Sequence, residues 1–267
     1  MVRELFRRGL DDHRRALASW CAGIGAYALM LAAIFPSVEG SADFSKLVQS
    51  YPEALKSLFG LTGSVNIGTG RGFVDTELFS FMLPLFAIVL AIGSGARTLA
   101  GEEDAGRLEL VLAYPVRRGA AVLGKGAAVA VEVAVFCAAS YAALALSSVA
   151  FGLDLPPGRL AGGLLGVGLL ALFHGWLALA VGAAWPSRAL AIGVPAAVAA
   201  GTYLVGGLHD LASWLDPLRF VSGFWWVGQA PLSNDPRWSG LPVVALAAVA
   251  ALGAAAYLIE RRDLETP

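Results

Sequence analysis

One stretch of the chain has the spacing of a phosphate-binding loop. Gly119-Ala-Ala-Val-Leu-Gly-Lys125 places two glycines and a lysine where backbone amides and an ammonium group could surround a phosphate. Gly126, however, stands where such a loop needs the hydroxyl of a serine or threonine to bind magnesium. The motif also has to join a buried strand to a helix, whereas this stretch leads into a long apolar run. The sequence therefore argues against nucleotide binding by this chain.

A second stretch, Glu102-Glu103-x-x-x-Arg107, matches the paired-glutamate motif of intramembrane prenyl-protein endopeptidases. Hydrolysis of that kind also needs distant histidines that help the carboxylates bind a metal or activate water. His174 is followed at the fourth place by Ala178, and no asparagine partners it. An intramembrane hydrolase is therefore a minor alternative, and we expect no catalytic residues and no metal site.

Two ionisable residues, Glu132 and His174, lie inside apolar runs, where such groups are functional candidates by default. Glu132 is two helical turns from Lys125 and could instead pair with Lys125 or Arg97. A single histidine makes no proton relay, so a packing role is favoured for His174. An ion-coupled secondary transporter would use such groups together with paired inverted repeats, and no repeat is evident. That class is the main alternative.

The elements that must position these residues are membrane helices. The chain has 267 residues, of which 57% are hydrophobic and 15% charged, an apolar excess that only lipid can cover. The net charge of -1 gives no reason to expect nucleic acid. Apolar runs without strict alternation predict helices and not a barrel. We expect an all-α integral membrane fold in one domain, residues 1–267, with spans at about 16–35, 78–96, 126–151, 160–184, 189–208 and 241–259.

The arginines and lysines predict the orientation. Of the 19, 13 flank one side of the six expected spans and 6 flank the other. The positive-inside rule then places both termini in the cytoplasm of a multi-pass protein of the cell membrane. Residues 1–15 alternate basic and apolar side chains, as an amphipathic interfacial helix does. The outer segments are 36–77, with a short helix near 44–59 followed by a glycine-rich loop, and the aromatic-rich segment 209–240.

The charged segment between the second and third spans, Ala100 to Arg118, is the most specific feature. It begins with Ala-Gly-Glu-Glu, continues through Leu108-Glu-Leu110 and ends at a proline closely followed by arginine. This pattern resembles the signature of type-2 ABC exporter permeases, although Arg107 and Arg117 stand where the family often has threonine and serine. The ending Glu260-Arg-Arg-Asp-Leu264 is also similar. The residues that would couple to an ATPase are Gly101, Glu102, Glu103, Asp104, Gly106, Arg107, Glu109, Pro115 and Arg118.

The resemblance also implies the contacts, partners and substrate class of the complete transporter. A coupling helix at about 101–113, the N-terminal helix beside it and the turn at 185–188 would contact two nucleotide-binding ATPase subunits. Those partners would hold ATP and magnesium, and this chain would hold no cofactor. A second permease copy or homologue would complete a dimer, and segment 209–240 would form re-entrant outer helices. Export of a hydrophobic drug, antibiotic or lipid-like substrate is expected, with path candidates Phe79, Phe81, Phe86, Thr202, Tyr203 and Glu132.

Overall fold

The computed structural model of the protein describes residues 2–41, 48, 50–61, 65–99, 101 and 118–261, with side chains from Arg14 onward. All regular structure in these ranges is helical, and six helices are long and apolar enough to cross a bilayer. The expected all-helical membrane fold with six candidate spans is therefore confirmed.

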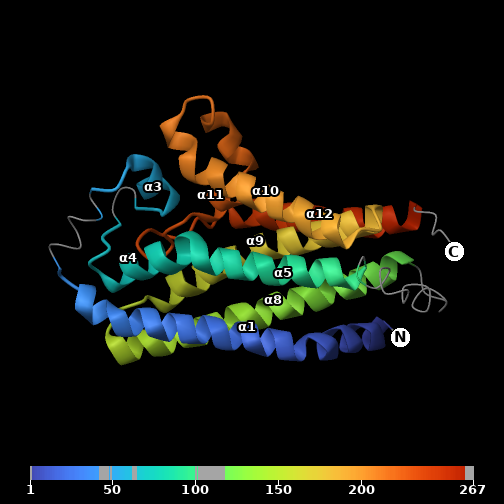
Figure 1. The fold of residues 1–267 in the computed structure, drawn as a ribbon, viewed down its shortest axis with the longest axis horizontal. Coiled ribbons are helices and arrows are strands. Elements are labelled where there is room, and N and C mark those ends of the chain that lie inside the picture. The colour runs from blue at the N-terminus through green and yellow to red at the C-terminus, as the bar shows by residue number, and fades with distance from the viewer. Residues whose placement is uncertain are drawn as a thin grey trace.

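The six long elements alternate in direction along the bundle (Figure 1). They are α1 (Val2–Val38), the π-helix η1 (Asp75–Met82) continued by α5 (Leu83–Thr98), α8 (Arg118–Phe151), α9 (Pro157–Ala184), α10 (Arg188–Leu208) and α12 (Leu241–Arg261). Shorter helices fill the connections at one end: α3 (Glu53–Leu58), α4 (Gly70–Val74), the 3-10 helices η2 (His209–Leu211) and η3 (Asp216–Val221), and α11 (Gly223–Val227).

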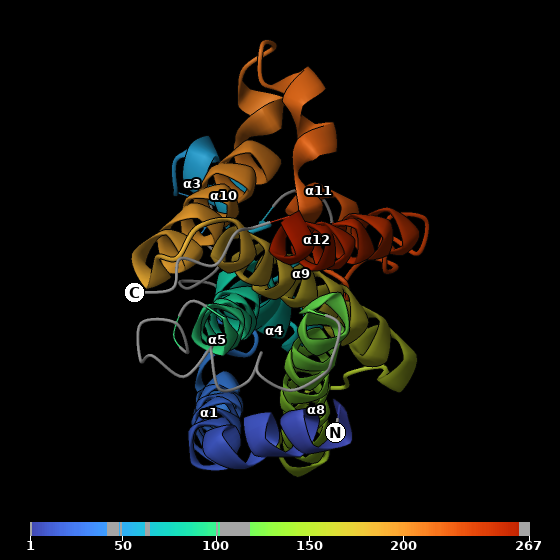
Figure 2. The ribbon, with the colours of Figure 1, turned by 90° about the vertical axis from the view of Figure 1, so that its right-hand side faces the viewer.

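Helices α5 and α9 lie in the middle of the bundle when it is seen end on (Figure 2). Helices α1 and α8 pack on one side of this pair, and α10 and α12 lie on the other. The largest core cluster joins α1, α5, α8 and α9 through aliphatic and aromatic side chains. Each helix can bury its apolar stripe in this way while its opposite face stays apolar for lipid.

Two glycines bring the central helices into backbone contact. A β-carbon on Gly95 of α5 would lie 2.2 Å from the carbonyl oxygen of Gly175 in α9, and one on Gly175 would lie 2.9 Å from the Ala91 β-carbon. Small residues are what permits such close helix packing in a membrane. The α5–α9 crossing therefore depends on glycine at both positions.

The second span begins earlier than the hydropathy indicates. The sequence predicted an outer loop through the glycine-rich run and a span from residue 78, but helix starts at Gly70. Thr69 caps it, since its hydroxyl accepts a hydrogen bond from the Gly72 amide at 3.2 Å. Glycine lets this turn pack closely, because a β-carbon on Gly72 would lie 2.1 Å from the Asn66 carbonyl oxygen. Hydropathy alone therefore places the start of this helix too late.

The third span also begins early. Helix α8 starts at Arg118, so the Gly119–Lys125 stretch lies within a continuous helix. A phosphate-binding loop needs a turn at its glycines, so the continuous helix through Gly119 and Gly124 excludes one here.

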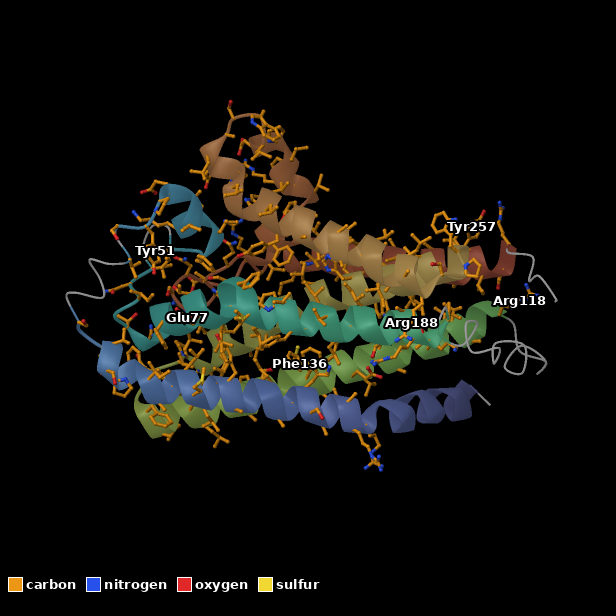
Figure 3. The ribbon with its side chains drawn as sticks, viewed as in Figure 1. Tyr51, Glu77, Arg118, Phe136, Arg188 and Tyr257 are labelled. Atoms are coloured by element: carbon orange, nitrogen blue, oxygen red, sulfur yellow. The ribbon has the colours of Figure 1, made fainter. Side chains whose placement is uncertain are left out.

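The start of α1 and the end of α12 lie at the same end of the bundle (Figure 1). Arg118, Arg188 and Tyr257 lie toward that end, and Tyr51 and Glu77 lie toward the other (Figure 3). An even number of spans, such as six, requires the first and the last helix to have their free ends on the same side of the membrane. Which side faces the cytoplasm, the interfacial placement of residues 1–15 and the re-entry of segment 209–240 into the membrane stay predictions.

Candidate functional site

The expected coupling helix falls between the ends of α5 and α8. Seven of its proposed residues lie outside the described part of the chain: Glu102, Glu103, Asp104, Gly106, Arg107, Glu109 and Pro115. Gly101 and Arg118 are described and border the segment. The turn at 185–188, expected as a second contact, links α9 to α10 at the same end, where the hydroxyl of Ser187 caps α10 and Trp185 is exposed.

A buried lysine ties together the two helices that lead into this segment. The Lys125 ammonium group of α8 donates a hydrogen bond to the carbonyl oxygen of Thr98, the last residue of α5. Carbonyls in the last turn of a helix have no intrahelical partner, and a cation there also interacts favourably with the helix dipole. The structure buries this lysine between helices, with 6% of its surface exposed.

Glu132 lies one level deeper in the same α5–α8 interface. It is only 2% exposed, and its carboxylate accepts a hydrogen bond from the Ser94 hydroxyl of α5. On the neighbouring turn of α8, the Trp176 indole of α9 donates to the Gly126 carbonyl oxygen at 3.0 Å. The polar groups of α8 therefore join it to both central helices, and Glu132 is held inside one subunit.

His174, the other ionisable candidate, is 1% exposed in α9. Its Nδ1 lies 2.8 Å from the Leu170 carbonyl oxygen of the preceding turn, and its ring packs edge-on against Phe173. This is the hydrogen-bonded packing role that the sequence favoured.

Three of the path candidates meet near the end of α10 that lies opposite the chain termini. The rings of Phe81 and Tyr203 lie 5.4 Å apart, and Phe224 of α11 packs against Tyr203 at 5.2 Å. The Tyr203 hydroxyl donates to the Leu58 carbonyl oxygen at 2.8 Å, and the Thr202 carbonyl oxygen accepts from Ser222 at 2.6 Å. Phe81, Thr202 and Tyr203 thus belong to one cluster that joins η1, α10 and α11.

The other path candidates lie elsewhere. Phe86 packs against Trp20 and Tyr27 of α1, with ring centroids 6.0 and 6.1 Å away. Phe79 is buried against Gly163 of α9. With Glu132 between α5 and α8, the six candidates do not line one continuous path within this subunit. Their role in transport stays a prediction.

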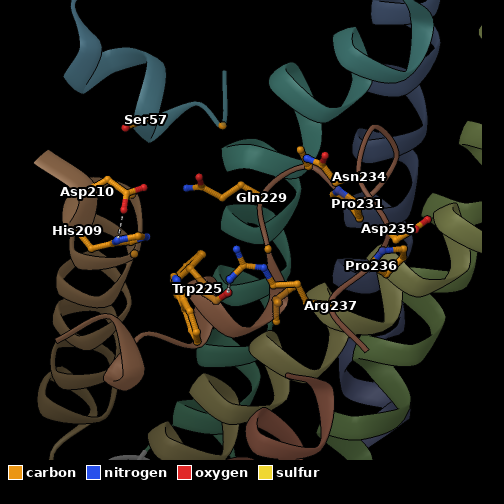
Figure 4. A pocket seen from close by; sticks show the side chains of 17 residues that line it. Ser57, His209, Asp210, Trp225, Gln229, Pro231, Asn234, Asp235, Pro236 and Arg237 are labelled. Carbon is orange, nitrogen blue, oxygen red and sulfur yellow. Dashed lines mark hydrogen bonds and ion pairs between the residues drawn. The ribbon is translucent and has the colours of Figure 1, made fainter. Parts of the chain in front are cut away.

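A polar cavity of about 200 Å³ opens at the end of the bundle opposite the coupling segment. One wall is formed by the end of α10 and by His209 and Asp210 of η2, and the other is the loop from Gln229 to Arg237 (Figure 4). The Arg237 guanidinium donates to the Trp225 carbonyl oxygen at 2.8 Å and stacks 4.9 Å from the Trp225 ring. Sequence reasoning missed this cavity because its residues come from segments that only the fold brings together.

Near this cavity His209, Asp210 and Asp216 place three possible metal ligand atoms within 4.8 Å of one another. The His209 Nδ1 lies 2.8 Å from an Asp210 oxygen, and Arg219 already pairs with Asp216 at 2.6 Å. The negative charge of Asp216 is thus balanced by a side chain, and the arrangement is consistent with an ordinary surface charge cluster.

Asp75 is a second group that sequence reasoning passed over. It is fully buried at the first residue of η1, and its two oxygens accept hydrogen bonds from the Leu232 and Ser233 amides of the cavity loop at 3.0 and 2.6 Å. A carboxylate at the edge of an apolar run was the available signal.

Comparison with known proteins agrees with this architecture. Residues 10–260 match the family model described as the multidrug efflux system permease Rv1217c, C-terminal domain. A stretch of 81 residues is 36% identical to the probable ABC transporter permease protein NosY of Stutzerimonas stutzeri, covering 30% of this chain and 28% of that protein. The family match spans nearly the whole membrane bundle, and the chain therefore belongs to a family of ABC transporter permeases, that of the multidrug efflux system permease Rv1217c.

Proposed function

We propose that this chain is the membrane subunit of an ATP-binding-cassette exporter and moves a hydrophobic drug, antibiotic or lipid-like substrate out of the cell. ATP would be hydrolysed by two separate nucleotide-binding subunits. The observation that carries the proposal is the charged segment from Ala100 to Arg118, which joins α5 to α8 within a bundle that matches an efflux permease family.

The described residues support a mechanical role for that segment. Its two ends are linked by the hydrogen bond from Lys125 to Thr98, so a force on the segment would act on α5 and α8 together. Glu132 and Ser94 continue the same connection deeper into the bundle. Closure of the partner ATPases would thus be converted into movement of the helices that line the substrate path.

A second copy of the permease is part of this proposal. Helix α10 presents an apolar outward face, with Leu190, Val194 and Leu204 each at least 40% exposed. The aromatic cluster around Tyr203 lies on the same helix. A dimer formed through α10 and α5 would bring these residues to a shared substrate path between the subunits.

The test is co-purification with a candidate nucleotide-binding ATPase from the same organism, followed by transport in proteoliposomes. The double variant Glu102→Ala/Glu103→Ala should lose ATPase binding while its membrane insertion is unchanged. The control Glu39→Ala/Glu53→Ala removes two exposed carboxylates from the opposite end of the bundle and should bind normally. Transport by the chain alone, abolished when the proton gradient is collapsed, would instead support an ion-coupled transporter.

A further inference from the structure

Two charged side chains hold one peptide group of the outer loop from opposite sides. The amide of the Leu232–Ser233 peptide donates to Asp75 Oδ2 at 2.6 Å, and its carbonyl oxygen accepts from Arg159 Nη1 at 3.0 Å. The N–H and C=O of a trans peptide point in opposite directions, so the peptide lies between the carboxylate and the guanidinium. Hydrogen bonds to charged groups are about twice as strong as those between neutral groups. We call this arrangement the peptide clamp.

Further contacts fix the loop on both sides of the clamped peptide. Asp75 Oδ1 also accepts from the Leu232 amide at 3.0 Å, and Arg159 Nη2 forms an ion pair with Asp235 at 2.7 Å. The Asp75 side chain has no exposed surface, and a buried carboxylate is strongly unfavourable unless it is paired or hydrogen-bonded. The clamp therefore satisfies Asp75 only while the loop is in this position.

The clamp connects the loop to a special part of the second span. Asp75 is the first residue of the π-helix η1, a rare helix type that occurs often at functional sites. The Ser80 hydroxyl shares its one proton between the Asp75 and Phe59 carbonyl oxygens, each 2.8 Å away. A shift of η1 would consequently move Asp75 relative to Arg159, which belongs to α9.

The clamped loop is also one wall of the outer cavity. Gln229, Pro231, Asn234 and Arg237 line that cavity from the loop, whereas His209 and Asp210 line it from η2, which follows α10. Pro231 packs tightly against α9, since a β-carbon added to Gly163 would lie 2.7 Å from the Pro231 ring. The loop therefore cannot move closer to α9. Movement of the loop away from α9 would therefore widen the cavity.

We propose that the peptide clamp is the latch of an outer gate, in which Asp75 and Arg159 keep the loop from residue 229 to 237 closed until η1 moves. The inference rests on the proposed function, since an exporter must release its substrate on this side. Asp75 and Arg159 are positioning residues in this scheme. They act on the loop and do not touch the substrate.

The test measures opening of the gate without any transport assay. Cys21 and Cys137 are replaced by Ala, and Ala230→Cys, which lines the cavity, is labelled with a membrane-impermeant maleimide in intact cells. We expect Asp75→Asn and Arg159→Gln each to raise the labelling rate roughly tenfold, the effect of losing one charge-assisted hydrogen bond on an opening equilibrium. In the double variant the rate should rise by less than the product of the two single effects, because both residues hold the same peptide.

Matched controls separate the latch from general damage. Arg71→Gln removes an arginine from the same end of the bundle, one that pairs with the exposed Asp154 at 2.5 Å and does not hold the loop, so labelling at position 230 should be unchanged. Glu53→Cys on the exposed surface of α3 should react at the same rate in every background. A rise at both positions, or equal labelling at position 230 in all variants, would overturn the latch. Failure to find an ATPase partner would overturn the proposed function and leave the labelling result intact.

Discussion

The ammonium group of Lys125 in α8 donates a hydrogen bond to the carbonyl oxygen of Thr98, the last residue of α5. Both residues are buried, and the chain between them contains the whole segment proposed to contact the ATPase. The hydrogen bond therefore holds together the two helix ends between which this segment runs. Movement of that segment would therefore displace α5 and α8 together.

Replacing Lys125 with Met should weaken this link. Loss of a hydrogen bond from a charged donor costs about 1.5–3 kcal/mol, so we expect a lower melting temperature in detergent. The partner ATPase should still bind, but its hydrolysis should no longer respond to substrate because the coupling between sites is reduced. Lys125→Arg, which keeps a donor, should retain part of the response. A full substrate response in Lys125→Met would show that the link carries no coupling.

Replacing Gly95 with Ala should separate α5 from α9. The added β-carbon would lie 2.2 Å from the Gly175 carbonyl oxygen, and overpacking of this kind costs about 1–3 kcal/mol. Gly93→Ala is the matched control two residues away, where the nearest atom is the Arg97 Nη2 at 3.9 Å. The control should be neutral or slightly stabilising, since alanine is the better helix former. Equal melting temperatures for the two variants would contradict the close crossing.

Replacing Glu132 tests whether its charge has a transport role. Glu132→Gln keeps an acceptor for the Ser94 hydroxyl, whereas Glu132→Ala leaves that hydroxyl buried without it, at a cost of about 1–3 kcal/mol. We expect the alanine variant to melt lower than the glutamine variant. If the residue serves packing alone, transport by Glu132→Gln will match the unmodified protein. Loss of transport in a normally folded Glu132→Gln protein would assign the carboxylate to the substrate path.

Replacing Tyr203 separates its hydroxyl from its ring. Tyr203→Phe removes the hydrogen bond to the Leu58 carbonyl oxygen and keeps the stacking with Phe81 and Phe224. We expect a stability loss of about 1 kcal/mol with unchanged substrate preference. Tyr203→Ala should change which hydrophobic substrates stimulate the ATPase, because the ring is lost. If the unmodified protein, Tyr203→Phe and Tyr203→Ala were all stimulated by the same substrates, Tyr203 would not belong to the substrate path.

Cysteine labelling from either side of the membrane checks the orientation. In the background without Cys21 and Cys137, Glu53→Cys should react with an impermeant maleimide applied outside intact cells. Trp185→Cys, in the exposed turn between α9 and α10, should react only after the cells are opened. The distribution of arginines and lysines is the physical reason for this expectation. The reverse labelling pattern would invert the topology.

Hydropathy was enough to predict the six long helices because each has to fill the thickness of a bilayer with apolar side chains. It placed the start of the second span too late, since the helical turn at Gly70 depends on the Thr69 cap and on close packing that only glycine allows. The cavity beside η2 and the contacts of Asp75 and Arg159 with its loop were not predictable, because residues more than 70 positions apart meet there. Burial of Lys125 was not predictable either, because its partner Thr98 lies 27 residues away on another helix.

The backbone contact between Gly95 and Gly175 also bears on how the protein responds to its lipids. The side chains nearest this crossing on the two helices are the methyl groups of Ala91 and Ala178, which have no rotamers, so no rotamer change can absorb a displacement of one helix against the other. A bilayer thicker or thinner than the apolar length of the bundle is accommodated by helix tilt. The α5–α9 pair would then tilt as one unit, which makes membrane thickness a variable that could bias the conformational equilibrium.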